Sequence, residues 1–425
     1  MVLSAINKTV LYCSPEMIAK YYEANNSFFE KTVPLSVVEV INGVVHPLEL
    51  SALDVTVDSY CGGVTDEALN FVGESLTKRI DPLDQSYVNS DWYIGANRNR
   101  IFDKVDYVDD DVVFIGALSK HYGHFILEGL ARLWFFLETE NLKFKCVYIS
   151  ENGIDPFVET FGLFGIDPKK LQKIDIPTRF RKVLIPEPSI RLSDYYHLKY
   201  NDTLSRIRDK VSPRSFEKVY FSKEGISNSR AVGEDFIQNV FVSNGFHVFH
   251  PEKMTMYEKI AVLRGARVFV ASSGTNVHNS VFLEDQCECI CLNRSAHYYA
   301  VQFMIDIMKK LNSTYVDVYI VPNRRRNFDP IGPFLLGPTK YLIYLFKSKG
   351  YGYSKYKLYR ALPLSIMAYA NVHLRSFFYL SSWRAYNKFS NSEYSGVKWM
   401  AKTLLNIYIF ARGKARSILS QLSSF

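Results

Sequence analysis

Residues 267–292 read RVFVASSGTNVHNSVFLEDQCECICL, and this stretch indicates the fold class. Residues 267–271 form a short run rich in Val and Phe that is typical of a buried strand. Small residues follow at 272–275, then a short helical segment at 276–283 and a second strand at 287–292. Strands joined through a helix run parallel, so the stretch predicts a βαβ unit of a parallel α/β sheet.

The turn of this unit leads into the N-terminus of a helix. Free N–H groups and the positive end of the helix dipole attract anions at such a position. The spacing of the small residues matches neither a dinucleotide fingerprint nor a P-loop, and any strand-to-helix turn favours Gly and Ser. The turn is therefore weak evidence when taken alone, and its residues are Ser272, Ser273, Gly274, Thr275 and Asn276.

Strands and helices alternate along residues 105–195 and again along residues 196–322. Two such blocks fit two facing Rossmann-like domains, with the cleft between them as the active site. A chain of 425 residues with 48% hydrophobic content is long enough for two or three domains. We expect domains at 1–195, with a poorly readable β-rich part at 1–100, and at 196–325, then a basic helical extension at 326–425.

A second stretch, residues 114–133, reads FIGALSKHYGHFILEGLARL. It predicts the end of a buried strand near Leu118, followed by an amphipathic helix over 122–138. His124 and Glu128 lie four residues apart on this helix and share one face. A carboxylate beside an imidazole fixes its tautomer and raises its basicity, which suits a general base. An ordinary surface pair at helical spacing is the competing interpretation.

Three segments resemble motifs of the family 61 glycosyltransferases, and the resemblance covers about residues 105–320. The family has a Tyr-x-His-x-x-x-Glu/Asp helix with Arg four residues beyond the acid. It then has a strand ending in Ser/Lys-Arg, a second Arg and Asn-Glu opening a helix, and finally a Gly-Ala-x-x-x-Asn turn before Phe-x-Pro. The matching residues here are Tyr122, His124, Glu128, Arg132, Ser222, Lys223, Arg230, Glu234, Gly274, Thr275, Asn279 and Phe282.

The chain departs from the family pattern at three matched positions. Lys223 replaces an Arg, Thr275 replaces an Ala, and Ala131 replaces a Pro. The acid that often ends the strand after the turn is absent, because Cys291 and Leu292 stand there. These departures leave the class unchanged but leave the identity of the donor open.

The resemblance implies a GT-B-like fold and an inverting transfer of a sugar from a nucleotide-sugar donor. The acceptor would be a saccharide or a lipid-linked saccharide of surface polysaccharide (capsule) synthesis, bound on the side of the first domain. We expect His124 and Glu128 to be catalytic, with either one as the base. The expected donor-binding residues are Lys223, Arg230, Ser272, Ser273, Gly274, Thr275, Asn276 and Asn279, and the possible supporting residues are Tyr122, Arg132, Glu234 and His250.

We expect neither a cofactor nor a metal, because cations can stabilise a leaving diphosphate and no Asp-x-Asp pair is placed for Mn²⁺. The run Asp109–Asp111 is more typical of a solvated turn. Cys287, Cys289 and Cys291 alternate along one strand face, too closely spaced for a tetrahedral zinc site, which predicts buried core thiols. Six cysteines without framework spacing, no signal peptide and no membrane-spanning segment together predict a cytoplasmic protein.

The basic residues of the chain are concentrated near its C-terminus. The formal net charge is +8, and residues 331–425 contain 14 Lys or Arg and a single acid, Glu393. Aromatic and aliphatic residues are interleaved with these charges, for example in Val397–Ala411. This composition favours helices lying on the anionic inner face of a membrane from residue 340 onward. Nucleic acid is the competing partner, since bases also stack on aromatic side chains, but long aliphatic patches favour lipid.

Two other function classes remain open at this point. One is a phosphotransferase on the same two-domain scaffold, which would release a nucleoside monophosphate in place of a diphosphate. The other is a non-catalytic scaffold that binds membrane or nucleic acid through its basic extension. A scaffold would not need the pair formed by His124 and Glu128.

Overall fold

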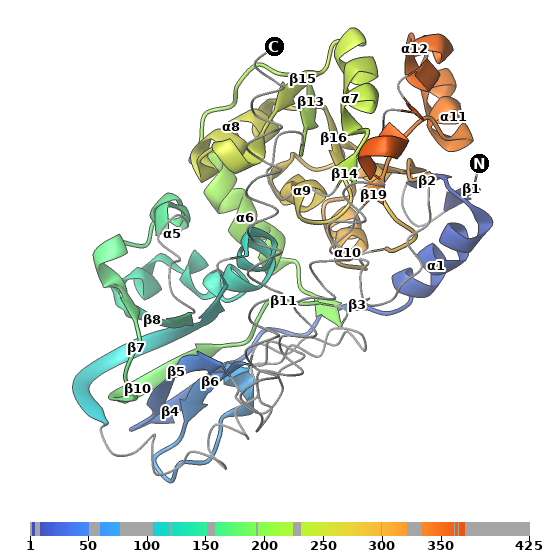
Figure 1. The fold of residues 1–425 in the computed structure, drawn as a ribbon. Helices are drawn as coiled ribbons and strands as arrows, with labels where there is room; N and C mark the ends of the chain where they lie inside the picture. Colours follow the sequence, from blue (N-terminus) through green and yellow to red (C-terminus); the bar gives the residue numbers. More distant parts are fainter. Residues whose placement is uncertain are drawn as a thin grey trace, which may run out of the picture.

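The computed structural model describes most of the chain up to residue 369, and the arrangement of its elements is drawn in Figure 1. The described residues are 2–4, 9–50, 60–76, 105–119, 121–150, 158–192, 194–223, 231–298, 300–320, 334–360, 362–363 and 365–369. Arg230 and the segment Val397–Ala411 lie outside them.

One mixed sheet is built from the first half of the chain. Its order is β6-β5-β10-β7-β8-β9, and β4 also pairs with β10. The neighbours β10, β7, β8 and β9 run parallel, whereas β4, β5 and β6 are antiparallel additions. The strands are β4 (Val37–Ile41), β5 (Val44–Leu50), β6 (Tyr60–Thr65), β7 (Asp106–Leu118), β8 (Lys145–Ser150), β9 (Leu171–Lys173) and β10 (Thr178–Pro186).

The second sheet has the order β1-β2-β18-β17-β16-β13-β15, and all of its strands run parallel except β1. It contains the predicted βαβ unit as β16, α9 and β17. Its strands are β1 (Val2–Ser4), β2 (Thr9–Tyr12), β13 (Lys218–Phe221), β15 (His247–Phe249), β16 (Val268–Ser272), β17 (Glu288–Asn293) and β18 (Asn312–Asp317).

The first residues of the chain join the second sheet and not the first. β2 pairs with β18, and the backbone N–H of Ser14 donates to Asp317 Oδ2 at 2.7 Å. The sequence expectation assigned residues 1–195 to one domain, but Val10 and Leu11 form their strand pairs with Thr314 and Tyr315. Two short apolar strands carry no signal for which sheet edge they will extend, so tertiary pairing decides it.

Helices cover both faces of the second sheet, as Figure 1 shows, and the predicted alternation of strands and helices is present. The helices are α1 (Pro15–Asn25), α4 (Tyr122–His124), α5 (Val158–Phe164), α6 (Lys199–Asp209), α7 (Glu234–Ser243), α8 (Met256–Gly265), α9 (Thr275–His278), α10 (Ala300–Met308), α11 (Lys340–Ser348) and α12 (Lys355–Arg360). The remaining short strands are β3 (Phe29–Glu30), β11 (Ile190–Arg191), β12 (Tyr195–Tyr196), β14 (Ala231–Val232) and β19 (Phe334–Leu335).

Alternation along the strands divides the second sheet between two hydrophobic clusters. Cys289 and Cys291 face one cluster with α8 and α10, while Ile290 and Leu292 face the other with α7 and α11. Both thiols are buried and free, and burial raises the pKa of each well above its ordinary value. The predicted core role is therefore confirmed for Cys289 and Cys291, whereas Cys287 is only partly buried.

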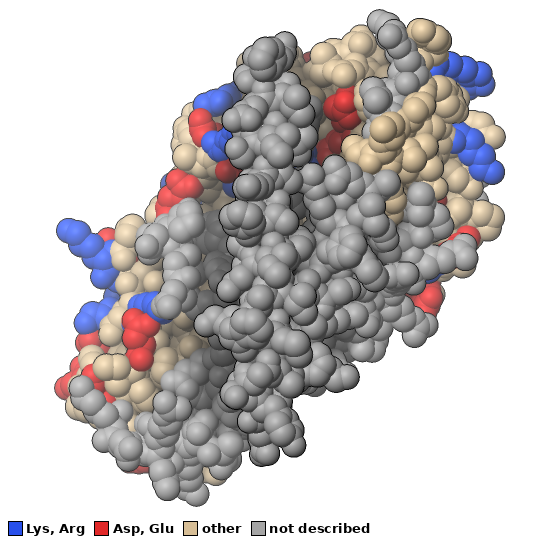
Figure 2. Space-filling view, viewed as in Figure 1, with Lys and Arg blue, Asp and Glu red and all other residues tan. Residues whose placement is uncertain are grey.

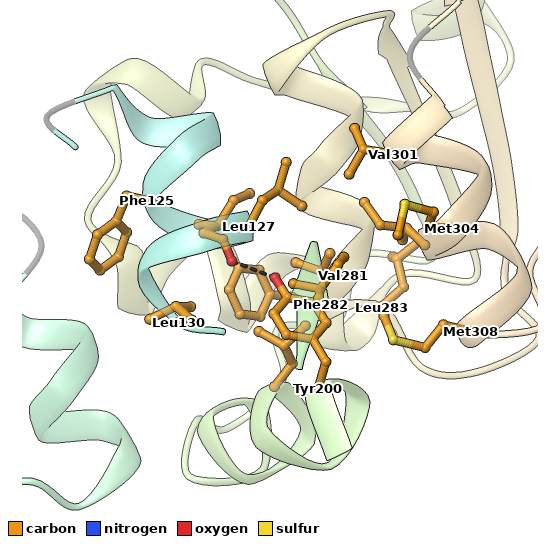
Figure 3. Packing of buried hydrophobic residues seen from close by; sticks show 14 of the residues in the cluster. Phe125, Leu127, Leu130, Tyr200, Val281, Phe282, Leu283, Val301, Met304 and Met308 are labelled. Atoms are coloured by element: carbon orange, nitrogen blue, oxygen red, sulfur yellow. Dashed lines mark hydrogen bonds between the residues drawn. The ribbon is translucent and has the colours of Figure 1, made fainter. Parts of the chain in front are cut away.

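The first of these clusters continues from the second sheet into the helical layer of the first, so the two halves share one core. Figure 3 shows Tyr200 of α6 in the same cluster of buried side chains as Leu127, Leu130 and Phe282. The Tyr200 hydroxyl donates to the carbonyl of Ile126, which ties α6 to the segment after α4. This packing fixes the chain around residue 126 relative to the second sheet.

The single α-helix expected over 122–138 is broken into three pieces. α4 is followed by a π-helical turn, Phe125–Gly129, and then by a 3₁₀ segment, Leu133–Leu137. π-Turns insert an extra residue into a helix and occur often at functional sites. The period of the apolar residues indicated a helix but carried no signal for this local change of pitch.

The start of the basic extension is part of the globular fold. α11 buries Leu342, Leu345 and Phe346 in the second cluster of the second sheet, so its apolar face is not available to a membrane. Lys340, Tyr344 and other polar or aromatic side chains of α11 and α12 are exposed. In Figure 2 Lys and Arg side chains stand out at the edge of the molecule where α11 and α12 lie in Figure 1. Among the described residues, no helix is both long and apolar enough to cross a bilayer.

Candidate active site

His124 and Glu128 form a hydrogen-bonded pair just beyond the carboxyl end of β7. His124 Nδ1 lies 2.8 Å from Glu128 Oε2, so the predicted contact between these side chains is present despite the π-turn. The Glu128 side chain is 9% exposed and that of His124 is 28% exposed. A buried carboxylate accepts, so it holds the ring proton on Nδ1 and leaves Nε2 as the basic nitrogen. Glu128 also lines a small pocket with Gly116, Arg132 and Arg191.

A hydrogen bond connects this segment to the second sheet. The Tyr122 hydroxyl donates to Asn279 Oδ1 at 2.7 Å, and Asn279 Nδ2 donates to the carbonyl of Asn276 at 2.9 Å. The ammonium of Lys259 lies 4.1 Å from the centre of the Tyr122 ring. Burial, with the nearby Glu159 carboxylate, raises the pKa of Tyr122 above its ordinary value, so the hydroxyl remains a donor. Burial lowers the pKa of Lys259 to about 8.

α4 and α9 approach closely at a glycine. A Cβ placed on Gly123 would lie 3.0 Å from Thr275 Oγ1 and 3.3 Å from His121 Cε1. The rings of His121 and His124 have their centres 4.9 Å apart. The histidine segment of the first sheet therefore lies against the Ser272–Asn276 turn of the second. The predicted catalytic pair therefore lies near the predicted turn.

Several chemistry-bearing residues gather at the carboxyl ends of the second sheet, where α/β proteins bind ligands. Lys223 follows β13, the turn at Ser273 follows β16, and Arg294 follows β17. The backbone N–H of Arg294 donates to Ser273 Oγ at 3.3 Å, so two of these loops touch. His250 follows β15, and this strand end lies beside that of β13, because the N–H of Ser222 donates to the carbonyl of Phe249 at 2.9 Å.

Glu234 stands behind the lysine. Its Oε1 accepts from the Tyr220 hydroxyl at 3.2 Å and from the backbone N–H of Lys223 at 3.3 Å. Burial raises the pKa of the Glu234 carboxyl, while burial and the neighbouring Arg294 lower the pKa of Lys223. Glu234 therefore supports the loop after β13, which is consistent with the supporting position expected from the sequence.

The Ser272–Asn276 turn is held in shape by its own backbone and by its neighbours. Gly274 has φ = +96°, a conformation that side chains rarely adopt. The N–H of Ser273 donates to the carbonyl of Leu292 at 2.9 Å, and Asn276 Nδ2 donates to the carbonyl of Phe221 at 3.4 Å. The turn therefore spans three neighbouring strand ends.

Arg132 is buried on the far side of the pair and has backbone partners. Its Nη1 donates to the carbonyl of Pro186, and its Nη2 donates to the carbonyl of Glu74 at 2.7 Å. Burial lowers the pKa of Arg132 to about 10. These contacts tie the end of β10 and the turn at residues 73–76 to the catalytic segment, which is a positioning role.

Sequence reasoning did not select Arg294, Lys259, His121 or His278 as site residues. Arg294 had a usable signal, since it directly follows a predicted strand at the same sheet edge as the turn. His278 is buried, and its Nδ1 lies 2.9 Å from Gln302 Oε1. Burial lowers the pKa of His278 to about 4. In the part of the chain that the structure describes, no three His, Cys, Asp or Glu side chains are grouped to hold a metal ion.

The architecture and this site define a mixed α/β protein with parallel sheets and a paired histidine and carboxylate at their facing ends. Residues 122–291 match the family model described as Glycosyltransferase 61, so this part of the chain is similar to glycosyltransferase family 61. The matched region runs from Tyr122 to Cys291 and includes the pair, Lys223 and the turn. The resemblance drawn from the sequence motifs is confirmed.

Two further comparisons add little to this assignment. A solved structure of a dodecameric iron-containing heptosyltransferase, TibC, in complex with ADP-D-beta-D-heptose is 9% identical, covering 62% of this chain and 79% of that chain, with a TM-score of 0.22. A likeness at this TM-score supports no argument about function. A search of curated proteins found no match.

Proposed function

We propose that this glycosyltransferase moves a sugar from a nucleotide-sugar donor to a saccharide or lipid-linked acceptor of surface polysaccharide synthesis, with inversion at the anomeric carbon. The observation that carries the proposal is the Tyr122–Asn279 hydrogen bond. It holds His124 and Glu128 against the Ser272–Asn276 turn at the facing ends of two parallel sheets. In this proposal the two sheets are the two Rossmann-like halves of a GT-B enzyme. The second half consists of the chain after about residue 195 together with β1 and β2, and residues 196–325 bind most of the donor.

The acceptor hydroxyl is deprotonated by His124 Nε2 as its oxygen attacks the anomeric carbon. Glu128 accepts the hydrogen bond from Nδ1 and stabilises the imidazolium that forms, so His124 is the base and Glu128 its orienting partner. The partly exposed position of the His124 ring supports this order, because Glu128 is the more buried of the two. The bond between the anomeric carbon and the donor phosphate oxygen breaks, and its electron pair leaves with the phosphate.

Negative charge on the leaving nucleotide is met at the edge of the second sheet. Lys223 and the N–H groups of the Ser272–Asn276 turn lie there, and Arg230 is a further proposed contact from the family motif. Charge from these side chains lets the reaction proceed without a metal or other cofactor in this proposal. The hydrogen bond between Tyr122 and Asn279 fixes the position of the base relative to the turn.

The basic C-terminal segment, in the same proposal, holds the enzyme on the anionic inner face of a membrane, where a lipid-linked acceptor would be presented. The buried apolar face of α11 limits this role to side chains that remain exposed and to residues beyond 369. Nucleic acid is not expected as a partner.

Product analysis tests the proposed reaction. Purified full-length chain would be incubated with a panel of nucleotide sugars and membrane extract, with and without EDTA, and nucleotide release would be followed by chromatography. We expect release of a nucleoside diphosphate that depends on acceptor and is insensitive to EDTA. Release of a nucleoside monophosphate from a diphosphate donor would indicate a phosphotransferase. No turnover of any donor, with membrane binding intact, would support the scaffold interpretation.

A further inference from the structure

Arg294 lies at the donor side of the site and has no role in the reaction described above. It follows β17 directly, and its backbone N–H donates to Ser273 Oγ in the turn. Its guanidinium lies over the same turn, since a Cβ built on Gly274 would be 2.9 Å from Arg294 Nη2. A side chain at position 274 would therefore displace the guanidinium, and glycine leaves room for it.

An aromatic ring fixes the plane of this guanidinium. The Cζ of Arg294 lies 4.5 Å from the centre of the Phe334 ring, at the start of β19. Stacking of this kind orients an arginine without using its N–H donors. The donors of Arg294 therefore remain available for a ligand, while the ring and the glycine hold the side chain in one place.

Polar groups around the guanidinium lack partners within the described chain. Arg294 Nε, Ser272 Oγ and Glu234 Oε2 are each buried without a hydrogen bond to any residue that the structure describes. Buried polar atoms in this state normally bind something, because an unmade hydrogen bond is costly. Ser272 is 1% exposed and Glu234 is 4% exposed, so these two side chains are enclosed by the protein and do not lie on open surface.

Charge at this position is also incompletely balanced. Arg294 lowers the pKa of Lys223, so the two cations are close enough to repel. Glu234 is the carboxylate that interacts with both cations: it raises the pKa of Lys223, and both cations lower its own pKa against the effect of burial. Two cations share this one carboxylate, and an excess of positive charge fits an anionic ligand. A phosphate can accept two parallel hydrogen bonds from one guanidinium.

We propose that Arg294, with Lys223, binds a phosphate of the donor nucleotide and remains on it as it becomes the leaving group. This inference rests on the proposed function for the identity of the ligand, but the phosphate site itself does not. The shared chemistry is a phosphate, so free pyrophosphate and a nucleoside diphosphate are both suitable probes.

Titration calorimetry on the full chain in phosphate-free buffer tests the assignment. The probes are inorganic pyrophosphate, UDP, ADP and GDP, each nucleotide paired with its nucleoside. The variants are Arg294→Gln, Arg294→Lys and the control Arg267→Gln. Arg267 is an 81% exposed arginine at the opposite end of the same sheet. The thermal midpoint of each variant is measured first.

We expect Arg294→Gln to weaken pyrophosphate and the tightest nucleoside diphosphate by about tenfold to a hundredfold, the range for one charge-assisted contact. The affinity of Arg294→Gln for the nucleoside should stay the same. The affinity of Arg294→Lys for pyrophosphate should lie between those of the unchanged protein and Arg294→Gln, and Arg267→Gln should bind as the unchanged protein does. If Arg294→Gln does not fold, Arg294→Lys tests the assignment, and its affinity for pyrophosphate should be a few-fold lower than that of the unchanged protein. Unchanged pyrophosphate affinity, an equal loss for the nucleoside, or no phosphate binding by the unchanged protein would overturn the assignment.

The same variants separate this inference from the proposed function. Sugar transfer with an unaltered donor KM in Arg294→Gln would leave the function standing and remove Arg294 from the site. Arg294-dependent binding of pyrophosphate without turnover of any nucleotide sugar would keep the phosphate site and remove the proposed reaction.

Discussion

At the scale of single residues, the two paired side chains, His124 and Glu128, are both able to accept a proton but differ in their exposure to solvent. Glu128 is the more buried, and its carboxylate is bonded to the ring of His124. His124 is partly exposed and stands beside His121, at the contact with the second sheet. Spacing in the sequence identified the pair but left either residue as the base. Burial and hydrogen bonding in the structure favour the histidine.

His124→Ala should lower turnover by about 10²–10⁴, because water would then have to remove the proton from the acceptor hydroxyl in place of the imidazole. Glu128→Gln should lower turnover over the same range, since the amide can donate to Nδ1 and favour the wrong tautomer. Donor binding should persist in both, measured by calorimetry beside steady-state kinetics. His247→Ala, an exposed histidine at the far end of β15, is the matched control. Near-normal turnover in both variants would make the pair structural.

At the scale of elements, the sequence predicted the parallel βαβ units well because buried strands and amphipathic helices leave clear periods. It did not predict the π-turn at Phe125–Gly129, in which the carbonyl of Ile126 accepts a hydrogen bond from the distant Tyr200. It also missed Arg294, whose role depends on a ring at Phe334 that is distant in sequence. Local pattern specifies elements, whereas a site assembled from several strand ends requires their pairing.

Gly123→Ala should separate α4 from α9, because the new methyl group meets Thr275 Oγ1 at 3.0 Å. We expect kcat/KM to fall by about tenfold to a hundredfold through misplacement of His124, with the fold retained. Gly162→Ala is the control: it lies within α5, and a Cβ there would meet nothing within 4 Å. That change should be neutral or stabilise by about 0.5–1 kcal/mol. Equal kinetics for the two variants would contradict a tight α4–α9 contact.

The β5–β6 hairpin contains a buried histidine that should make stability depend on pH. His46 is 2% exposed, its Nε2 lies 2.9 Å from Thr65 Oγ1, and burial lowers its pKa from 6.5 to about 4. Because the folded pKa lies below the unfolded one, the stability it contributes is complete above pH 6.5 and is lost as pH falls toward 4. The loss amounts to about 3 kcal/mol.

Chemical unfolding of the unchanged protein and of His46→Gln at several pH values tests this. The advantage of histidine over glutamine should shrink between pH 7 and pH 4. Taking the difference between the two proteins removes the opposite effect of Asp306, whose pKa is raised to about 6 by burial. A difference that does not vary with pH would mean that His46 is not held neutral.

At the scale of the whole molecule, the basic extension divides into a packed part and a remainder. α11 packs against one face of the second sheet. A chain that ended before α11 would therefore lose Leu342, Leu345 and Phe346 from the core. From composition, all of residues 326–425 were predicted to be one basic, membrane-associating extension. Composition does not show which apolar helix face packs against the rest of the protein. A test of membrane binding must therefore keep the chain through residue 369.

A chain ending at residue 369 should keep its fold and lose most of its binding to anionic liposomes. Each Lys or Arg near an anionic surface contributes about 1 kcal/mol, and eight of them lie beyond residue 369. Flotation of the full and shortened chains with vesicles of rising anionic lipid content measures the difference, and circular dichroism checks the fold. Equal flotation of the two chains, or no dependence on anionic lipid, would contradict the membrane role.

The pairing of β2 with β18 has a consequence for folding during synthesis on the ribosome. Ser14 and its partner Asp317 are 303 residues apart, so the strand before Ser14 is synthesised well before the strand with which it pairs. At about 5–20 residues per second, the wait is about 15–60 seconds. Throughout it, the apolar strand containing Val10 and Leu11 has no parallel neighbour and is open to chaperones or to other nascent chains. The last sheet to close in each new molecule is therefore the one that holds the proposed donor site.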